Sequence, residues 1–326
     1  YRPSAGRWDL RVQIARYLAV ARGVACDPAQ IFITNGYQGA LGLITRVLMR
    51  PGDAILVEHP GYPIGRHAMQ VAGMRPIGVS IDEEGFDISA AEAGRRAVRC
   101  ALVTPTHEYP LGVTLSLQRR MALLAWAEQT EGWIIEDDYD AEFRYHGRPL
   151  PALKSLDRLG RVLFVGTFSK VLSPGLRVGY LVVPSDLVQR FTEMADGLQP
   201  PPAAVVQAAI AAFIDEGYLA RHIRRMRLLY AERRSALAAA LQDATGAALE
   251  IELQSGGMHL LGRLPRGCRD RQLATELNRR GIAVSPLSAC GVERPYAAGL
   301  LLGFTNVAAK NAVDAARRLA DGLDRV

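Results

Sequence analysis

Short apolar runs, separated by loops and by longer segments, constrain the fold of this 326-residue chain most strongly. After each run comes a loop with glycine, proline, aspartate or histidine, and usually then a longer segment with 3.6-residue spacing. Uninterrupted apolar strands are typical of sheets buried on both faces, so the pattern predicts an α/β fold with a mostly parallel sheet. Functional residues are then expected in the loops after the strands. The runs are residues 31–33, 54–57, 101–103, 133–135, 162–165 and 181–183.

Composition restricts the class of protein. A hydrophobic content of 49% and a charged content of 22% are those of an ordinary globular protein, and the length suits a large domain with a smaller lobe. Because no apolar stretch approaches the ~20 residues that span a bilayer and no signal peptide is evident, we expect a cytoplasmic protein with no membrane contact. Without a Cys-x-x-Cys pair, neither a zinc site nor a disulfide framework is indicated. The cysteines are Cys26, Cys100, Cys268 and Cys290.

The C-terminal part has a different pattern. After the prolines at 200–202, residues 203–241 have helical spacing, with an apolar face that includes Leu219, Ile223 and Tyr230. A row of arginines occupies the rest of this segment and leaves two readings open, a nucleic-acid or partner surface and a solvated helix face, of which the second is the more common. From residue 246 onward, short strands alternate with helices and predict an α+β lobe. The arginines are Arg221, Arg224, Arg225, Arg227, Arg233 and Arg234.

Lys170 is the first candidate functional residue. It follows the 162–165 run in the sequence Gly-Thr-Phe-Ser-Lys, and Arg177 stands seven residues further on. Burial and a nearby cation both lower the pKa of a lysine, and a deprotonated amine at neutral pH attacks carbonyl groups. This position therefore favours a nucleophilic Lys170, and the alternative is a surface lysine beside a turn.

An acidic segment, residues 136–140, follows the 133–135 run. An ionised carboxylate at a strand end near a lysine suits a pyridine cofactor, because it keeps the ring nitrogen protonated. Taken alone, the aspartate pair equally indicates a Mg²⁺ site or a solvated surface. Its place between the loop at 104–112 and the Lys170 segment favours the cofactor.

Together these segments resemble the fold-type I pyridoxal-phosphate (PLP) enzymes, the aspartate aminotransferase superfamily. More narrowly, residues 104–112, 136–145, 166–170 and 216–230 resemble the aminotransferase-like effector domain of MocR-type GntR-family transcription regulators. The resemblance covers nearly the whole chain and implies a seven-stranded-type, mostly parallel sheet flanked by helices, with a smaller α+β C-terminal lobe. It also implies a segment at 1–20 that links the lobes, a large PLP-binding domain at 21–215, and a long helix with the small lobe at 216–326.

Carried over by position, the resemblance assigns roles to individual residues. It implies that Lys170 forms the internal aldimine with PLP and that Asp137 pairs with the pyridinium nitrogen. Tyr139 would hydrogen-bond the ring hydroxyl, and Tyr62 would stack on the ring unless it is a core aromatic. Tyr1 matches a tyrosine that reaches the phosphate of a neighbouring subunit, which implies a homodimer with shared sites. Phosphate contacts are implied for Gly36, Tyr37, Gln38, Thr167 and Arg177, and contacts near the ring for His107 and Tyr109.

Two positions depart from the family pattern. Glu108 stands where the regulators carry a glutamine. A further negative charge there, beside the other carboxylates, would alter the protonation of groups around the ring. Leu301 stands where aminotransferases carry the arginine that binds the substrate carboxylate in a bidentate fork. Leucine cannot bind a carboxylate. Arg294, upstream, is either a substitute or a loop surface residue.

The resemblance therefore predicts a PLP-binding domain that senses an amine, an amino acid or PLP itself. The alternative is an active fold-type I aminotransferase, in which Lys170 would also move the substrate α-proton. DNA would be contacted only through a winged-helix domain that such regulators carry and that is absent from this chain. No metal is expected.

Overall fold

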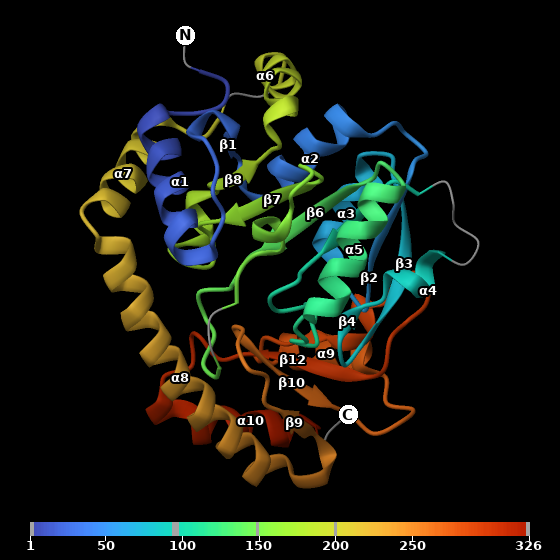
Figure 1. Cartoon of the computed structure of the whole chain (residues 1–326). Coiled ribbons are helices and arrows are strands. Elements are labelled where there is room, and N and C mark those ends of the chain that lie inside the picture. Colours follow the sequence, from blue (N-terminus) through green and yellow to red (C-terminus); the bar gives the residue numbers. More distant parts are fainter. Residues whose placement is uncertain (1–2, 93–97, 148–149, 199–200, 324–326) are drawn as a thin grey trace.

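The computed structural model describes residues 3–92, 98–147, 150–198 and 201–323 (Figure 1). Its large sheet has the strand order β1-β8-β7-β6-β5-β2-β3-β4. All six apolar runs form strands of this sheet, so the predicted α/β class is confirmed. The strands are β1 (Ile31–Thr34), β2 (Ala54–His59), β3 (Arg75–Asp82), β4 (Gly85–Phe86), β5 (Cys100–Val103), β6 (Trp133–Asp138), β7 (Val162–Thr167) and β8 (Gly179–Val182).

The sheet is mostly parallel, as predicted. Strands β3, β2, β5, β6 and β7 pair in parallel, whereas β8 is antiparallel to both of its neighbours, β7 and β1. The two-residue β4 adds a short hairpin beyond the seven expected strands. No apolar run indicated β3, because it lies near the edge of the sheet and alternates buried with exposed residues.

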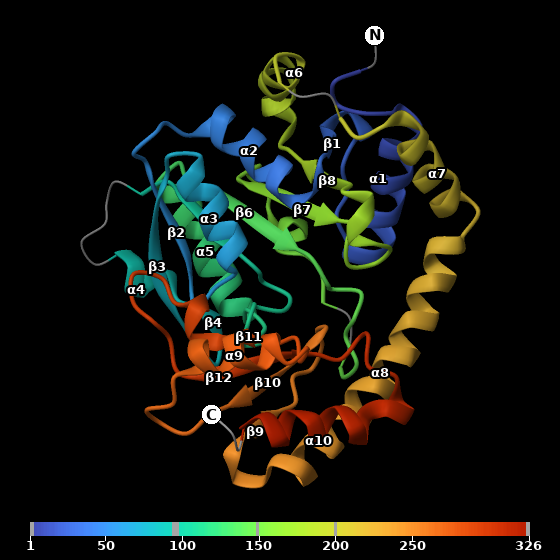
Figure 2. The ribbon, with the colours of Figure 1, turned by 180° about the vertical axis from the view of Figure 1, so that it is seen from behind.

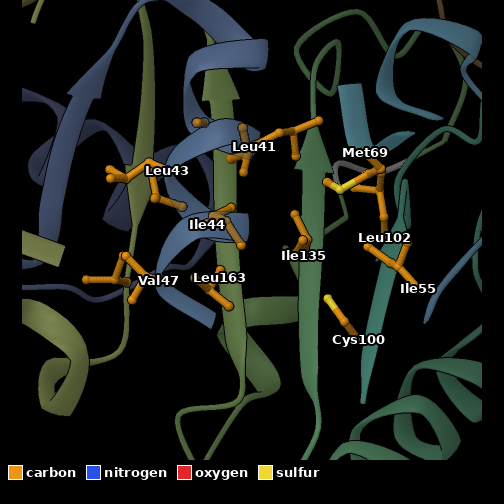
Figure 3. Close-up of a cluster of buried hydrophobic side chains, with 14 of the residues drawn as sticks. Leu41, Leu43, Ile44, Val47, Ile55, Met69, Cys100, Leu102, Ile135 and Leu163 are labelled. Carbon is orange, nitrogen blue, oxygen red and sulfur yellow. The ribbon is translucent and has the colours of Figure 1, made fainter. Parts of the chain in front are cut away.

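Side chains alternate between the two faces of the sheet, and helices cover both faces. Ile135 and Leu163 pack on one face with Leu41 and Ile44 of α2 (Figure 3), whereas Ile134 packs on the other. Burying each such side chain stabilises the fold by about 1.5–3 kcal/mol. Figure 1 shows α1 (Trp8–Arg22) and α5 (Leu117–Gln129) over the second face, and Figure 2 shows α2 (Gly36–Leu48) and α3 (Pro63–Val71) over the first. The other helices of this domain are α4 (Ile88–Glu92), α6 (Val188–Asp196) and α7 (Ala204–Asp215).

The segment predicted as one helix at 203–241 forms two helices, α7 and α8 (Tyr218–Thr245). The break occurs because Gly217 adopts a left-handed backbone conformation with φ of 73°. The predicted apolar face is correct: Leu219 and Ile223 are buried against the large domain. Further along the same helix, Leu237 and Leu241 belong to the core of the C-terminal lobe. Helix α8 therefore connects the two lobes (Figure 1).

The C-terminal lobe is α+β, as predicted, with an antiparallel sheet of order β11-β12-β10-β9. Its core includes Leu260 of β10, Leu302 of β12 and Leu277 of α9. The elements are β9 (Glu250–Glu252), β10 (His259–Arg263), α9 (Asp270–Arg279), β11 (Ser285–Pro286), β12 (Gly299–Gly303) and α10 (Ala312–Leu323). In the part of the chain that the structure describes, no helix combines the length and apolarity needed to cross a membrane.

The arginine row of α8 divides into two groups. Arg233 and Arg234 donate hydrogen bonds to the carbonyl oxygens of Thr305 and Gln254 in the C-terminal lobe. Arg227 binds the Glu142 carbonyl at 2.8 Å. Arg221 also donates to a backbone oxygen, the Glu216 carbonyl, at 3.1 Å. Four of the six arginines therefore hold backbone carbonyl groups, which neither reading of the sequence predicted. The exposed arginines of the row are Arg221, Arg224, Arg225 and Arg227.

Candidate functional site

A cavity of about 380 Å³ lies where the ends of the central strands meet the C-terminal lobe. This volume is in the range of small-molecule sites. The polar ends of β6 and β7 reach it from one side and residues of β10 and β12 from the other. The structure thus brings together most of the residues assigned from the sequence. Those that line the cavity are Lys170, Asp137, Tyr139, Tyr62, Tyr37, Gln38, Thr167, Arg177 and Tyr109.

Lys170 lies on a turn after β7 and lines the cavity with Thr167 and Ser169. Its side chain is exposed, so the burial expected from the sequence is wrong. The reason is local: the chain leaves the sheet at Thr167, and the following turn presents the lysine to the cavity rather than to the core. An amine in this position is accessible to a ligand.

Asp137 stands near the end of β6 and is 6% exposed. Burial raises its pKa well above the ordinary value, whereas a hydrogen bond from Tyr37 favours the charged form. Because successive residues of a strand face opposite ways, Asp138 lies on the other face, in an ion pair of 2.6 Å with Arg22. The two aspartates therefore do not share a Mg²⁺ site. Among the described residues, no cluster of three metal-ligating side chains is present.

A second carboxyl group, Glu58, lies behind Asp137. Its oxygens accept hydrogen bonds of 2.7 Å from the backbone N–H and the hydroxyl of Thr104. Burial raises the pKa of Glu58 to about 7. A small cavity of about 20 Å³, large enough for one water molecule, is lined by Glu58, Thr104, Tyr37 and Asp137. The ionisation of Asp137 is thus coupled to that of Glu58, whose charge raises the pKa of Asp137 further.

The N-terminus of α2 and Arg177 form a cradle whose chemistry suits an anion. Gly36 has φ of 72°, and a Cβ atom there would lie 3.6 Å from the guanidinium of Arg177. A guanidinium nitrogen of Arg177 lies 3.4 Å from the side-chain oxygen of Gln38. Helix α2 begins without a side-chain cap in the described structure, so its first N–H groups and its dipole favour an anion.

Aromatic side chains surround the centre of the cavity. The ring of Tyr62 lies 6.0 Å from that of Tyr37 and 5.1 Å from that of Tyr109. The hydroxyl of Tyr139 lies 3.1 Å from Nδ1 of His107. His107 itself is buried and is not among the described residues that line the cavity. It contacts the site through Tyr139 and through the ring of His259, 6.3 Å away.

Glu108 is 2% exposed and accepts a 3.0 Å hydrogen bond from the Leu111 N–H. Burial, followed by the neighbouring Glu58, raises its pKa well above the ordinary value. Burial and the neighbouring Glu58 thus both favour the protonated form of Glu108, and they oppose the added negative charge expected from the sequence. The assignment of Tyr1 lies outside the described residues.

The C-terminal lobe supplies the remaining wall of the cavity, including Leu301 of β12 and His259 of β10. Arg294 is exposed and is not among the described lining residues, which agrees with a loop surface residue, the more common of the two alternatives. Sequence reasoning missed His259, Thr104 and Glu58. The last two follow or end strands, a signal that could have found them. His259 carried no such signal, because it begins a strand of the other lobe. The other lining residues from this lobe are Met258, Ser285 and Gly303.

Comparisons with known proteins agree with this architecture. The profile of the family "Aminotransferase class I and II" matches residues 1–312. The chain is 37% identical over 302 residues to the probable rhizopine catabolism regulatory protein MocR of Rhizobium meliloti, covering 93% of this chain and 61% of MocR. It is 33% identical to the HTH-type transcriptional regulator YdeL of Bacillus subtilis (strain 168), covering 98% of this chain and 69% of YdeL. The chain thus spans about two thirds of the length of these regulators.

A solved structure is similar along the whole chain. The kynurenine aminotransferase of Pyrococcus horikoshii, crystallised in complex with PMP, has a TM-score of 0.90 and 30% sequence identity. The similarity covers 100% of this chain and 82% of that enzyme. The fold of this chain is therefore that of the fold-type I aminotransferases.

Proposed function

Because this chain belongs to the class I and II aminotransferase family and corresponds to the aminotransferase-like domain of MocR-type regulators, we propose that it is a PLP-binding, effector-sensing domain of such a regulator. The observation that carries the proposal is the two-sided cavity. Lys170, Asp137 and Arg177 line it with the chemistry that PLP requires, whereas Leu301 stands where the family's enzymes bind a substrate carboxylate. The site supports cofactor binding better than it supports turnover of amino acids.

The residues present fit PLP. The cradle of Gly36, Gln38 and Arg177 suits a phosphate dianion, because it combines helix N–H groups with a guanidinium fork. Tyr62 would cover one face of the ring. The cofactor, when bound, supplies a carbonyl carbon to which primary amines attach reversibly and a ring that withdraws electrons.

Three side chains of this chain would control protons around the ring. Asp137, buried at the end of β6, would hold the proton on the pyridine nitrogen, and the positive charge there would favour the charged form of its carboxylate. Lys170 would carry the cofactor. When an effector amine takes its place on the cofactor, the freed Lys170 amine would accept the proton that the effector loses. Tyr139, fixed by His107 at 3.1 Å, would orient the ring through its hydroxyl.

The two-lobed cavity suggests how binding is relayed. An effector in this cavity would contact β10 and β12 of the small lobe as well as the large domain, and α8 has buried side chains in both. A ligand that binds one arrangement of the lobes more tightly shifts the population toward it. We place the large PLP-binding domain at 21–215 and the moving lobe at 216–326. Homodimerisation, with Tyr1 reaching a neighbouring site, and contact with DNA through a separate domain complete the proposal.

Covalent trapping tests the assignment of the cofactor. The protein is incubated with PLP, treated with sodium borohydride, digested and analysed by mass spectrometry. The chain has lysines at 154, 170 and 310 only, so the site of modification is unambiguous. We expect pyridoxyl modification at Lys170. Modification at Lys154 or Lys310 instead, or none at all, would refute the proposal.

An active aminotransferase is the second candidate. Its support is the likeness to the P. horikoshii enzyme at 30% identity and the accessible amine of Lys170 in a cavity. Consumption of a keto acid acceptor distinguishes the two, since a sensor binds its amine without net transfer.

A further inference from the structure

The wall of the cavity that faces the bound amine is neutral, and this wall restricts the chemical class of the effector. The inference rests on the proposed function, because it takes Lys170 and PLP as the point where the amine is bound. It concerns the residues that the small lobe contributes, chiefly Met258, His259 and Leu301.

Leu301 presents an apolar surface to the cavity and packs against apolar side chains behind it. It is 5% exposed and belongs to a cluster with Leu261, Leu287 and Cys290, against which Tyr109 also packs. In the sheet, Leu301 pairs with Leu261 of β10. The side chain is therefore held in place by packing, and nothing at this point of the wall can neutralise an anion.

Two arginines of the surrounding elements are held by other partners. Arg66 donates to the carbonyl oxygens of Gly291 and Ala289, and Arg271 donates to Ser288. Of the described residues that line the cavity, the cationic ones are Lys170 and Arg177. Lys170 is the attachment point, and Arg177 belongs to the phosphate cradle at α2. No described cation is left for a carboxylate of the effector.

His259 is polar but uncharged. Its Nε2 lies 3.0 Å from the carbonyl oxygen of Pro110, and a carbonyl only accepts, so Nε2 carries the proton and Nδ1 is an acceptor. Burial lowers the pKa of His259 to about 4, with a smaller contribution from the nearby Lys170. The imidazole is thus neutral at neutral pH, and it can receive a hydrogen bond from a ligand but cannot pair with an anion.

We propose that the effector is a primary amine without an α-carboxylate, whose neutral substituent packs against Leu301 and Met258. A hydroxyl or amide N–H on that substituent would donate to Nδ1 of His259. An amino acid would have to lose the hydration of its carboxylate against a wall with no described cation to pair with it, which is costly.

The test uses matched amines on the PLP-loaded protein. 2-Phenylethylamine, L-phenylalaninamide and L-phenylalanine share a ring and an amine, and only the last carries a carboxylate. Each is titrated while the visible absorption band of the cofactor and the thermal midpoint are recorded. We expect the two neutral-substituent amines to give half-maximal change at concentrations at least about ten-fold lower than L-phenylalanine.

Two variants make the test specific. Leu301→Arg is expected to reverse the order in favour of L-phenylalanine by about ten-fold, because it restores a bidentate partner. Leu301→Lys serves if the arginine variant does not fold, since the lysine stem can lie along the apolar cluster. Leu301→Met is the matched control and should keep the native order.

The outcomes separate the two proposals. If L-phenylalanine binds the native protein as tightly as the amines or more tightly, the proposed class of effector is wrong. The same conclusion follows if the Lys170-dependent band forms but none of the three compounds changes it. If no such band forms with PLP, the proposed function itself is wrong, independently of the class of effector.

Discussion

The two walls of the cavity differ in what they are made of. The wall from the large domain consists of strand ends and a helix N-terminus, and it carries Lys170, the buried Asp137 and the exposed Arg177. The wall from the small lobe carries Leu301, Met258 and a neutral His259. The residues that we propose for the cofactor thus lie on one side, whereas the described residues of the other side include no cation for a substrate carboxylate. This difference supports the proposed sensor over an aminotransferase, because turnover requires that the amino acid be held in position.

The largest effect is expected from removal of Lys170, on the large-domain wall. Lys170→Ala should abolish the visible absorption band of PLP bound to the protein, because no other lysine lines the cavity among the described residues. The band is measured after removal of free PLP. Lys310→Ala, on the 3₁₀ turn before α10, is the matched control and should retain the full band. A band of native intensity in the Lys170 variant would contradict the site.

Arg177→Ala tests phosphate binding on the same wall. Loss of a charged hydrogen-bond donor to the phosphate costs about 1.5–3 kcal/mol, so the Kd for PLP should rise about 10- to 100-fold. The Kd is measured by quenching of tryptophan fluorescence. Arg294→Ala, on an exposed loop of the small lobe, should leave the Kd unchanged. Equal effects of the two substitutions would mean that Arg177 does not bind the phosphate.

Glu58→Gln tests the buried acids behind Asp137. The pKa of Glu58 is raised to about 7, so the native state holds a proton that the unfolded state releases above its own pKa of about 4.3. Stability contributed by this group is present below pH ~4.3 and is lost as the pH rises to about 7. Without cofactor, the free energy of unfolding of the native protein should fall from pH 5 to pH 8. The fall in the Glu58→Gln variant should be smaller by about 1–3 kcal/mol.

The measurement is urea unfolding at both pH values. Glu250→Gln, exposed on β9, is the matched control and should follow the native protein. An unchanged pH dependence in Glu58→Gln would show that Glu58 is ionised in the folded protein.

Leu301→Met is expected to give the smallest effect. The substitution conserves volume and polarity on the small-lobe wall, so the Kd for PLP should change by less than about two-fold. The same fluorescence titration measures it. A change of ten-fold or more would mean that the small lobe takes part in holding the cofactor, and the division between the two walls would no longer hold.

Much of the large-domain wall could be predicted from sequence, because parallel strands bring their carboxyl ends to one edge. The apolar runs located β6 and β7, and the polar residues after them, Asp137 and Lys170, do line the same cavity. The exposure of Lys170 could not be predicted, since it depends on the path of the turn after Thr167.

The small-lobe wall could be predicted only in part. Leu301 followed from its position relative to the family pattern, but the role of His259 depends on how the lobe docks against Pro110, 149 residues away in sequence. The raised pKa of Glu108 likewise depends on its burial beside Glu58. Such properties arise from tertiary packing and leave no local signal. The break at Gly217 was missed because the helical spacing on both sides of it is regular.

Transfer of the amino group tests the central claim most directly. The PLP-loaded protein is mixed with 2-phenylethylamine, L-phenylalaninamide or L-phenylalanine in the presence of excess 2-oxoglutarate, and both the visible spectrum and glutamate formation are followed. We expect a lasting spectral shift with 2-phenylethylamine and L-phenylalaninamide, the two amines without a carboxylate, and less than one equivalent of glutamate per protein. Repeated turnover, with many equivalents of glutamate formed from L-phenylalanine, would contradict the account and identify the chain as an aminotransferase.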